Sequence, residues 1–371
     1  MKILHATEVE IGGTVTVLTM LLQSQIRTDI IQSTICLVPQ RQIESLTGIP
    51  IENIKTYKRT GRNLTSFFAF VFSLIKLTIK ERPDIIHLHS TFAGLLGRIA
   101  LAPFLPFIKA KIIYCPHGFS FLMDSSEKKK KLFSIIETVL SKITAKIICV
   151  SEYEKKSAIK AGIREEILVV IHNGVSRIDS FDKKTTYPFK GKDLNLIFVG
   201  RLDPAKGFDT LFDAMKLLEH FPVHLTVLGI SDAEIPAEFR SANISYMGWC
   251  SQEEMHPYFT HADALVLTSR WEGFPMVTLE AMNYSIAVVA SDCTSLSESV
   301  KHDITGFLFP VSDYKKLAEI ILATSSEKWK EMGINGRKYY LENFTSEKMT
   351  LSTFNLYQVI QEQPYEVETK I

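Results

Sequence analysis

Short apolar runs alternate with segments of helical periodicity along nearly the whole chain of 371 residues, and this alternation constrains the fold more than any other feature. In the first half it predicts helices at about 14–27, 64–81, 92–102, 127–143 and 152–161, and strands at 2–6, 31–38, 84–88, 111–115, 145–150 and 167–171. Elements in this order form βαβ units around a parallel sheet. Such sheets bind ligands at the carboxyl ends of their strands.

A polar stretch over 176–192, with Pro188 and Gly191, interrupts the alternation and predicts a linker. A second series follows, with strands expected at 194–199, 223–229, 244–247, 264–267, 286–290 and 306–309. The sequence therefore predicts two α/β domains, 1–175 and 193–344, followed by a helix over 345–362 and a polar tail over 363–371.

The net charge of +1 hides an uneven distribution. Residues 1–174 carry nine more Lys and Arg than Asp and Glu, and the remainder carries eight more acidic than basic residues. This asymmetry indicates that the two domains have different partners. The basic residues are spread through an α/β pattern that contains no nucleic-acid motif, so we do not expect nucleic acid to be one of them.

The cysteines and the apolar segments indicate the compartment. Five cysteines occur singly, with no C-x-x-C, which is typical of reduced thiols in a cytosolic protein. The first residues enter a strand directly, so we expect no secretory signal. The apolar segment 67–79 is interrupted by Lys76 and is too short to span a bilayer. The predicted helix that contains this segment has apolar residues at helical spacing, which predicts a core-facing stripe, with a membrane-surface role as the secondary alternative. The stripe consists of Leu64, Phe67, Phe68, Val71, Leu74 and Ile75.

The stretch 268–282 carries the clearest chemistry. A predicted buried strand, 264–267, leads into a turn at Gly273 and a helix with Pro275 at its first position. A helix N-terminus offers free N–H groups and partial positive charge to a phosphate. Glu272 and Glu280 flank that position, and a carboxylate can accept two hydrogen bonds from a vicinal diol. A diphosphate between two diols describes a nucleotide-sugar.

Other residues at predicted strand ends could take part. Arg201 and Lys206, in Gly-Arg-Leu-x-x-x-Lys-Gly, provide two cations for a phosphate. Gly12 and Gly13 allow the backbone to approach a ligand closely, although from these residues alone a plain tight turn is the better explanation. His117 could hydrogen-bond a substrate hydroxyl or simply cap a loop. His87 and His89 alone make a poor metal site, so a packing or hydrogen-bonding role is expected for this pair.

The wording Glu-Gly-Phe-Pro…Glu-Ala-Met, with seven residues between Glu272 and Glu280, resembles the E-x7-E signature of retaining glycosyltransferases of the GT-B fold, family four. That fold has two Rossmann-like domains facing across a cleft, with a C-terminal helix crossing back to the first domain. The resemblance implies that an acceptor enters the N-terminal domain near Gly13. It implies catalytic roles for His117, Arg201, Lys206 and Glu272. It implies that the donor contacts Gly12, Gly13, Arg201, Lys206, Gly248, Gly273, Phe274, Pro275, Met276, Val277 and Glu280.

The chain departs from the family pattern after the second glutamate. The family usually continues with Gly-x-Pro, whereas Ser285 and Ala287 stand at those positions here. We expect altered loop packing and no loss of chemistry.

No D-x-D sequence occurs, so the carboxylates that hold a metal in many other sugar transferases are missing. We expect a metal-independent hexosyltransferase without a cofactor, in which Arg201 and Lys206 stabilise the departing diphosphate. No residue is committed to a nucleophile's role. The family resemblance implies that the acceptor attacks on the face from which the diphosphate leaves.

Basic clusters in the first domain suggest the acceptor. Lys128–Lys131 and Lys55–Arg62 would be attracted to an anionic lipid surface. The phrases His-Leu-His-Ser and Pro-His-Gly-Phe resemble those of bacterial polysaccharide transferases. We therefore expect a saccharide linked to undecaprenyl diphosphate, in lipopolysaccharide O-antigen, capsule or exopolysaccharide synthesis. The alternative is a soluble acceptor, with a basic face that only keeps the protein in solution. The protein would be cytoplasmic and peripherally bound to the inner face of the membrane.

Two alternatives remain open from the sequence. Another GT-B enzyme, such as a sugar-nucleotide epimerase or a phosphorylase, would share the fold and much of the donor site. A non-catalytic nucleotide-sugar binding module would also bind the donor. The presence of all four of Arg201, Lys206, Glu272 and Glu280 favours an enzyme.

Overall fold

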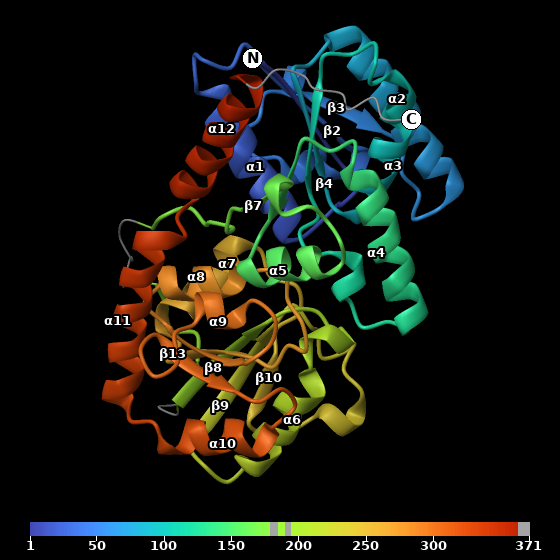
Figure 1. Ribbon diagram of the computed structural model, residues 1–371. Helices are drawn as coiled ribbons and strands as arrows, with labels where there is room; N and C mark the ends of the chain where they lie inside the picture. The colour runs from blue at the N-terminus through green and yellow to red at the C-terminus, as the bar shows by residue number, and fades with distance from the viewer. Residues whose placement is uncertain (179–184, 190–193, 363–371) are drawn as a thin grey trace. The chain divides into compact units, whose positions relative to one another are not determined.

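The computed structural model describes residues 1–178, 185–189 and 194–362 (Figure 1). The chain divides into two compact units. Unit 1 comprises Met1–Gly174 and the C-terminal helix α12 (Ser346–Glu362), and unit 2 comprises Val175–Thr345. Each unit contains one parallel sheet with helices, which confirms the predicted pair of Rossmann-like α/β domains. Part of the predicted linker, 179–184 and 190–192, and the predicted tail, 363–371, lie outside the described residues.

The sheet of unit 1 has seven strands in the order β3-β2-β1-β4-β5-β6-β7. The strands are β1 (Lys2–Thr7), β2 (Ser33–Pro39), β3 (Ile54–Tyr57), β4 (Ile85–His89), β5 (Lys111–Cys115), β6 (Lys146–Cys149) and β7 (Leu168–Val170). The sequence missed β3, because Lys55 and Thr56 break the apolar run of this four-residue edge strand.

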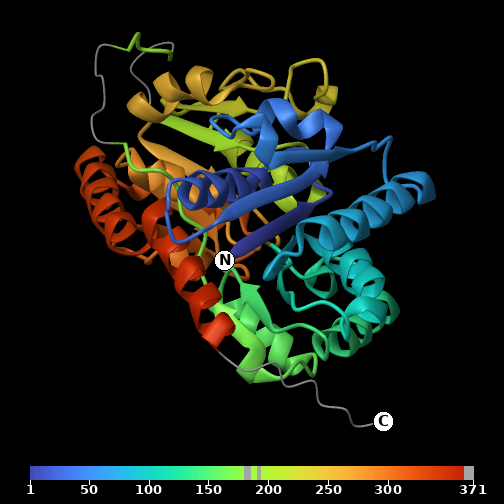
Figure 2. The same ribbon diagram turned by 90° about the horizontal axis from the view of Figure 1, so that it is seen from above.

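Helices cover both faces of this sheet. They are α1 (Gly13–Ile26), α2 (Leu64–Glu81), α3 (Thr91–Leu101), α4 (Glu127–Ser141) and α5 (Glu152–Lys160), together with α12. Figures 1 and 2 show α1 and α12 on one side of the sheet and α2, α3 and α4 on the other. Helix α3 packs against both α2 and α4.

Successive side chains of β1 and β4 point to opposite faces of the sheet. Leu4 and Ala6 of β1, with Ile86 and Leu88 of β4, join the apolar core that also contains Phe70 and Leu74 of α2. The intervening residues are histidines, which face α1 and α12: His5 pairs in register with His87, and both hydrogen-bond to side chains of those helices.

Helix α12 is held to unit 1 by polar contacts as well as by packing against α1. The hydroxyl of Tyr357 lies 2.6 Å from Nδ1 of His87. Nζ of Lys111 donates to the carbonyl of Ile360 at 2.6 Å. A C-terminal helix packed on the N-terminal sheet agrees with the crossing helix that the family resemblance implies.

The sheet of unit 2 has six strands in the order β10-β9-β8-β11-β12-β13. They are β8 (Leu194–Val199), β9 (Val223–Leu228), β10 (Ile244–Tyr246), β11 (Ala264–Leu267), β12 (Ala287–Ser291) and β13 (Gly306–Phe309). Its helices are α6 (Phe208–Leu217), α7 (Gln252–His261), α8 (Met276–Asn283), α9 (Leu296–Ser299), α10 (Tyr314–Ala323) and α11 (Ser326–Asn343). All six strands were predicted, each within one residue at either end.

The prediction of a buried stripe on the helix over 64–81 is wrong in part. Leu74 of α2 is buried, but Leu64 and Phe68 are 72% and 71% exposed. The buried aromatic residue is Phe70. Leu64, Phe68, Phe72 and Ile79 recur at helical spacing, so α2 carries an apolar face that the fold leaves uncovered.

Candidate functional site

Strands β8 and β11 lie side by side in the middle of the unit 2 sheet, and the strand order runs outward from them in both directions. The point at which such an order reverses is where parallel sheets bind ligands, outside the carboxyl ends of the strands. The loop after β8 contains Arg201 and Lys206, and the loop after β11 contains Glu272. The topology therefore brings the predicted residues of unit 2 to one edge.

Backbone hydrogen bonds join these two loops. The amide of Arg270 donates to the carbonyl of Ala205 at 2.7 Å, and the Thr268 hydroxyl donates to the carbonyl of Lys206 at 3.0 Å. The approach requires glycine at 207, where φ is +59° and an added Cβ would collide with the carbonyl oxygen of Thr268. The glycine of the Arg…Lys-Gly motif is thus explained by the packing of one loop on the other.

Lys206 and Glu272 form an ion pair, with Nζ 2.7 Å from Oε1. The Ser269 hydroxyl donates to the same carboxylate oxygen at 2.6 Å. Thr294 holds the Glu272 backbone, because its Oγ1 accepts from the Glu272 amide at 2.9 Å and donates to the Glu272 carbonyl at 2.8 Å. The sequence did not single out Ser269 or Thr294, since neither forms a spacing pattern with the charged residues.

Helix α8 begins at this edge. Pro275 is the N-cap residue and supplies no side-chain cap, so α8 begins at Met276, one residue later than the sequence predicted. The first turn of α8 contains no acidic residue. The amides of Met276 and Val277 therefore point out of the helix without a side-chain acceptor, which suits an anion. Phe274 is buried beside them and packs on Phe344 of the same unit.

Glu280 lies on α8 one turn after this N-terminus. Its carboxyl is partly buried and has no hydrogen-bond partner among the described residues. Burial raises the pKa of Glu280 to about 7. A carboxyl group that is desolvated and unpartnered at the edge of a parallel sheet is a candidate binding group, because a ligand's hydroxyls could supply the missing hydrogen bonds.

The turn after α8 contains Ser285, the first departure from the family pattern, and the second, Ala287, is the first residue of β12. Amides of Ser285 and Ile286 donate to the carbonyls of Met282 and Ala281, at 3.0 and 2.9 Å. This is the Schellman arrangement, whose left-handed position usually holds glycine. Ser285 occupies it with φ of +62°. Serine thus replaces the family's glycine at 285, and the Schellman turn still forms.

Arg201 and Gly248 complete the predicted set in unit 2. Arg201 is exposed and makes no hydrogen bond or ion pair within the described part of the chain. Gly248 follows β10, and its carbonyl accepts from the Gly229 amide at 2.7 Å. Gly273 lies in the turn before Pro275. All three follow carboxyl ends of strands in the same sheet, as expected.

The remaining predicted residues lie in unit 1. Gly12 is the N-cap residue of α1, with φ of +109°, and Gly13 is the first residue of that helix. His117 follows β5 with φ of +53°. Its Nε2 lies 3.1 Å from Nδ1 of His89, and burial lowers the pKa of His117 to about 4. Thus His117 is neutral at physiological pH and is held by a buried neighbour.

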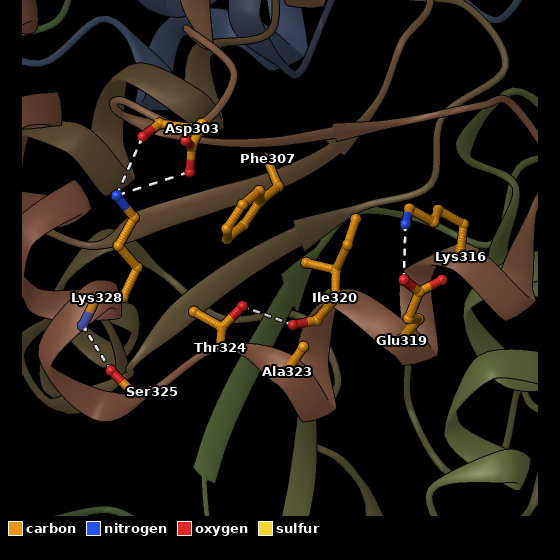
Figure 3. A pocket seen from close by; sticks show the side chains of 9 residues that line it. All are labelled: Asp303, Phe307, Lys316, Glu319, Ile320, Ala323, Thr324, Ser325 and Lys328. Atoms are coloured by element: carbon orange, nitrogen blue, oxygen red, sulfur yellow. Dashed lines mark hydrogen bonds and ion pairs between the residues drawn. The ribbon is translucent and has the colours of Figure 1, made fainter.

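A hollow of about 410 Å³ lies elsewhere in unit 2 (Figure 3). Its wall includes Phe307 at the start of β13 and Ile320 of α10, so it is at the amino end of that strand. The charged side chains around it are paired: Lys328 lies 3.6 Å from Asp303, and Lys316 lies 2.8 Å from Glu319. None of the predicted site residues lines it.

Comparisons with known proteins agree with this geometry. A family model for "Glycosyltransferase Family 4" matches residues 11–177, and one for "Glycosyl transferases group 1" matches residues 179–339. A Klebsiella pneumoniae protein described as an uncharacterized 41.2 kDa protein in the cps region is 32% identical over 363 residues, covering 96% of this chain and 99% of that protein. This chain is a group 1 glycosyltransferase of the GT-B fold.

Other relatives of the glycosyltransferase include named enzymes. The Escherichia coli UDP-Gal:alpha-D-GlcNAc-diphosphoundecaprenol alpha-1,3-galactosyltransferase is 27% identical over 278 residues, 70% of each chain. Among solved structures, HepE of Anabaena in complex with UDP and glucose has a TM-score of 0.77 at 19% identity, covering 97% of this chain and 100% of that chain. At that identity the likeness shows the fold alone.

A glycosyltransferase of this fold uses a nucleotide-sugar donor, and the geometry of unit 2 offers groups of the right chemistry for one. The helices within the described residues include none that is long and apolar enough to cross a membrane.

Proposed function

We propose that this glycosyltransferase moves a sugar from a nucleotide-sugar to a lipid-linked saccharide, with retention of configuration and without a metal ion, during assembly of a bacterial surface polysaccharide. Relatives named for O-antigen, amylovoran and capsule biosynthesis support the pathway. The UDP-Gal enzyme of Escherichia coli, named for a diphosphoundecaprenol acceptor, supports the lipid-linked substrate.

The observation that carries the proposal is the unpartnered, partly buried carboxyl of Glu280 one turn inside α8. It accepts the ribose hydroxyls of the donor. The amides at the start of α8 bind the diphosphate, with Arg201 and Lys206 as counter-charges that replace a metal ion. Glu272, already held by Ser269 and Lys206, accepts hydroxyls of the transferred sugar.

The reaction then needs little from the protein beyond charge and position. The bond between the anomeric carbon and the diphosphate breaks, and negative charge develops on the departing oxygen next to the two cations. The acceptor hydroxyl attacks from the same face, and its proton passes to the leaving phosphate. His117 accepts or donates a hydrogen bond at a substrate hydroxyl.

A donor screen tests the assignment. UDP-, GDP- and dTDP-sugars are added to the full-length protein, and the melting temperature is measured, since a ligand that binds only the folded state raises it. Glu280→Ala should weaken binding of the best donor by about tenfold or more, the effect of losing a charged hydrogen-bond acceptor. Glu319→Ala, at the hollow of Figure 3, is the matched control and should bind the donor normally.

An unchanged donor affinity in Glu280→Ala would remove Glu280 from the site. Mass analysis of the donor incubated with the protein alone separates the alternatives. A modified nucleotide-sugar in the absence of any acceptor would indicate an epimerase. A donor that binds and never reacts, with any saccharide acceptor, would indicate a binding module.

The uncovered apolar face of α2 supports a membrane-bound acceptor. Besides Phe68, Phe72 is 69% exposed, and Lys76 and Lys80 of the same helix are exposed. Helix α4, on the same side of the sheet, repeats this arrangement with exposed Leu132, Ile135 and Val139 after the lysine run. Apolar side chains beside lysines fit an anionic bilayer surface, in which the chains enter the interface and the lysines meet headgroups.

The second basic cluster contributes less than the sequence predicts. Arg59 is paired with Glu10 at 2.8 Å, and Arg62 lies over the ring of Phe92. The membrane-binding face that we propose is therefore α2 and α4, and the proposal locates the protein at the inner face of the membrane.

Sedimentation with vesicles tests this face. The protein should pellet with anionic vesicles and remain in solution with neutral ones, and salt should release it. The double variant Phe68→Ser, Phe72→Ser should weaken binding to the vesicles. Replacement of Lys128–Lys131 by Gln should also weaken it, by about 1 kcal/mol for each lysine that is lost. Leu351→Ser removes another exposed apolar residue, from α12, and serves as the control. Equal binding to neutral vesicles, or none at all, contradicts the proposal.

A further inference from the structure

A buried row of histidines connects the interior of unit 1 to His117. His5 of β1 and His89 of β4 are fully buried, and Nδ1 of His5 lies 2.9 Å from Nε2 of His89. Nδ1 of His89 lies 3.1 Å from Nε2 of His117. At the inner end, Nε2 of His5 lies 2.9 Å from Oε1 of Gln25 on α1. The four side chains form one continuous hydrogen-bonded chain.

All three rings are neutral. Burial lowers the pKa of His5 and of His117 to about 4, and the pKa of His89 well below its usual value. A neutral imidazole has one N–H donor and one bare nitrogen acceptor. In a chain of neutral rings, the direction of the first hydrogen bond therefore fixes the direction of every later one.

Gln25 sets that direction. The structure places its Oε1 against Nε2 of His5, and the same oxygen accepts from the Thr34 hydroxyl at 3.4 Å. His5 must then carry its proton on Nε2, and its Nδ1 accepts from Nε2–H of His89. By the same step Nδ1 of His89 accepts from Nε2–H of His117. His117 is left with a bare Nδ1, which has no hydrogen-bond partner in the described part of the chain.

We propose that Gln25, His5 and His89 are positioning residues that hold His117 in the tautomer with its proton on Nε2, so that Nδ1 accepts a hydrogen bond from a hydroxyl of the bound sugar. The inference rests on the substrate-binding role proposed for His117. It makes His117 an acceptor toward the sugar, not a donor.

The alternative occupant of this cluster is a metal ion, since ring nitrogens of His5, His87 and His89 lie within 4.8 Å of one another. A metal would need the bare nitrogens of both His5 and His89, and would remove the proton that they share. It would also place a double positive charge among buried rings whose partners are Gln25, Tyr357 and other histidines, none of them anionic. The absence of anionic partners among these side chains favours a proton between His5 and His89 over a bound metal ion.

The strand offers a matched control. His87 is two residues before His89 on β4, faces the same side, and is equally buried. Its Nδ1 pairs with Tyr357, which also hydrogen-bonds to Gln25, and its Nε2 has no hydrogen-bond partner, so His87 makes no direct hydrogen bond to the rings that lead to His117. Replacing His87 or His89 by Phe keeps a ring of similar shape, but only His89→Phe breaks the chain.

Nitrogen-15 NMR of the histidine rings in the full-length protein reads the tautomers directly, and loss of a signal in each single variant assigns it. In the unmodified protein His5, His89 and His117 should each carry a proton on Nε2 and a bare Nδ1 at neutral pH. In His89→Phe the His117 ring should exchange between tautomers, while His87→Phe should leave it unchanged. Gln25→Met, which retains all the rings, should have the same effect on His117 as His89→Phe.

Sugar transfer gives the second measurement. Turnover should fall about tenfold in His89→Phe, the cost of a misoriented hydrogen bond, and should be unchanged in His87→Phe. A proton on Nδ1 of His117 in the unmodified protein, an unaltered His117 tautomer in both His89→Phe and Gln25→Met, or one bound metal ion per chain would each overturn the inference. If the tautomers are as expected but His117→Gln transfers sugar at the full rate, the hydrogen-bond chain stands and the role of His117 in substrate binding fails.

Discussion

The carboxyl edges of the two sheets carry opposite kinds of chemistry on the same fold. In unit 2 the edge is charged: the pair of Lys206 and Glu272 and the exposed Arg201 stand at the start of a helix. In unit 1, β4 ends in His89, which hydrogen-bonds to His117 after β5 and to His5 inside β1, and burial favours the neutral form of these rings. Charge binds a diphosphate, whereas a fixed neutral ring reads the direction of a hydroxyl, so each edge suits a different part of a sugar-transfer reaction.

The largest effect should come from the charged edge. Lys206→Ala removes a cation next to the developing charge and should lower turnover by about 100-fold or more, with little change in stability, since the ion pair is partly exposed. Arg201→Ala should act in the same direction. Lys316→Ala, which breaks the ion pair with Glu319 in the same unit, should have normal turnover.

Turnover and thermal melting of these variants test whether the two cations act in catalysis and not in folding. Normal activity in Lys206→Ala would show that the diphosphate binds elsewhere. If a chelator abolished the activity of the unmodified enzyme, a metal ion, and not Lys206 and Arg201, would stabilise the departing diphosphate.

The two sheet edges also differ in how tightly their glycines are packed. Gly207 in unit 2 and Gly12 in unit 1 both have positive φ, but only at Gly207 would a Cβ strike a backbone carbonyl, while Gly12 has nothing within 4 Å of that position. Gly207→Ala should therefore lower the free energy of unfolding by roughly 3 kcal/mol, from strain and overlap together. Gly12→Ala should cost roughly 1 to 2 kcal/mol, from conformation alone. Denaturant melts of both variants test the order, and equal losses would contradict it.

The sequence predicted more of the candidate site residues in unit 2 than in unit 1, for a physical reason. Chemistry carried by charged residues at fixed spacing, as in Glu272 and Glu280, is visible without a structure. The chain from Gln25 to His117 joins residues far apart in sequence, and only the register of β1 against β4 brings His5 and His89 together. The sequence predicted a packing or hydrogen-bonding role for His87 and His89 as a pair, but their different partners could not be foreseen.

The sequence also failed to predict which apolar helix faces are buried. The strands were found because both faces of a parallel sheet are apolar, so every strand reads as an apolar run. Whether an apolar helix stripe faces the core or the surroundings depends on where the helix packs, which its periodicity does not show. Phe68 of α2 was assigned to the core for that reason, and the structure leaves it exposed.

Glu280 gives a smaller effect with a sign that depends on pH. Its folded pKa of about 7 lies above the ordinary value of 4.5, so the folded protein holds a proton that the unfolded chain releases between these values. Stability from this group is present below the lower value and is lost as pH rises through 7. Glu280→Gln cannot ionise, and should be more stable than the unmodified protein above neutral pH by at most about 3 kcal/mol, which corresponds to the shift from 4.5 to about 7.

Melting temperatures of the two proteins should therefore be similar at about pH 5 and diverge by about pH 8. The gain should be confined to the free protein, because donor hydroxyls stabilise the carboxylate when bound. Histidines of unit 1 provide the contrast: with folded pKa values lowered to about 4, His5 and His117 resist protonation, so their contribution to stability is lost on acidification. A pH-independent difference between Glu280→Gln and the unmodified protein would show that Glu280 is ionised throughout.

The smallest effect compares helix ends in the two units. Ser285 follows α8 in unit 2 and Arg82 ends α2 in unit 1, and both hold left-handed conformations, with φ of +62° and +48°. Glycine adopts this conformation without strain, although it also gives the unfolded chain more freedom. Ser285→Gly and Arg82→Gly should each raise the free energy of unfolding by about 0.5 to 1 kcal/mol. Ser285→Gly should leave turnover unchanged, because the Schellman hydrogen bonds after α8 are already formed with serine. A rise in turnover on restoring the family's glycine would mean that the serine displaces Glu280, and that the departure from the family pattern alters the donor site as well as the turn.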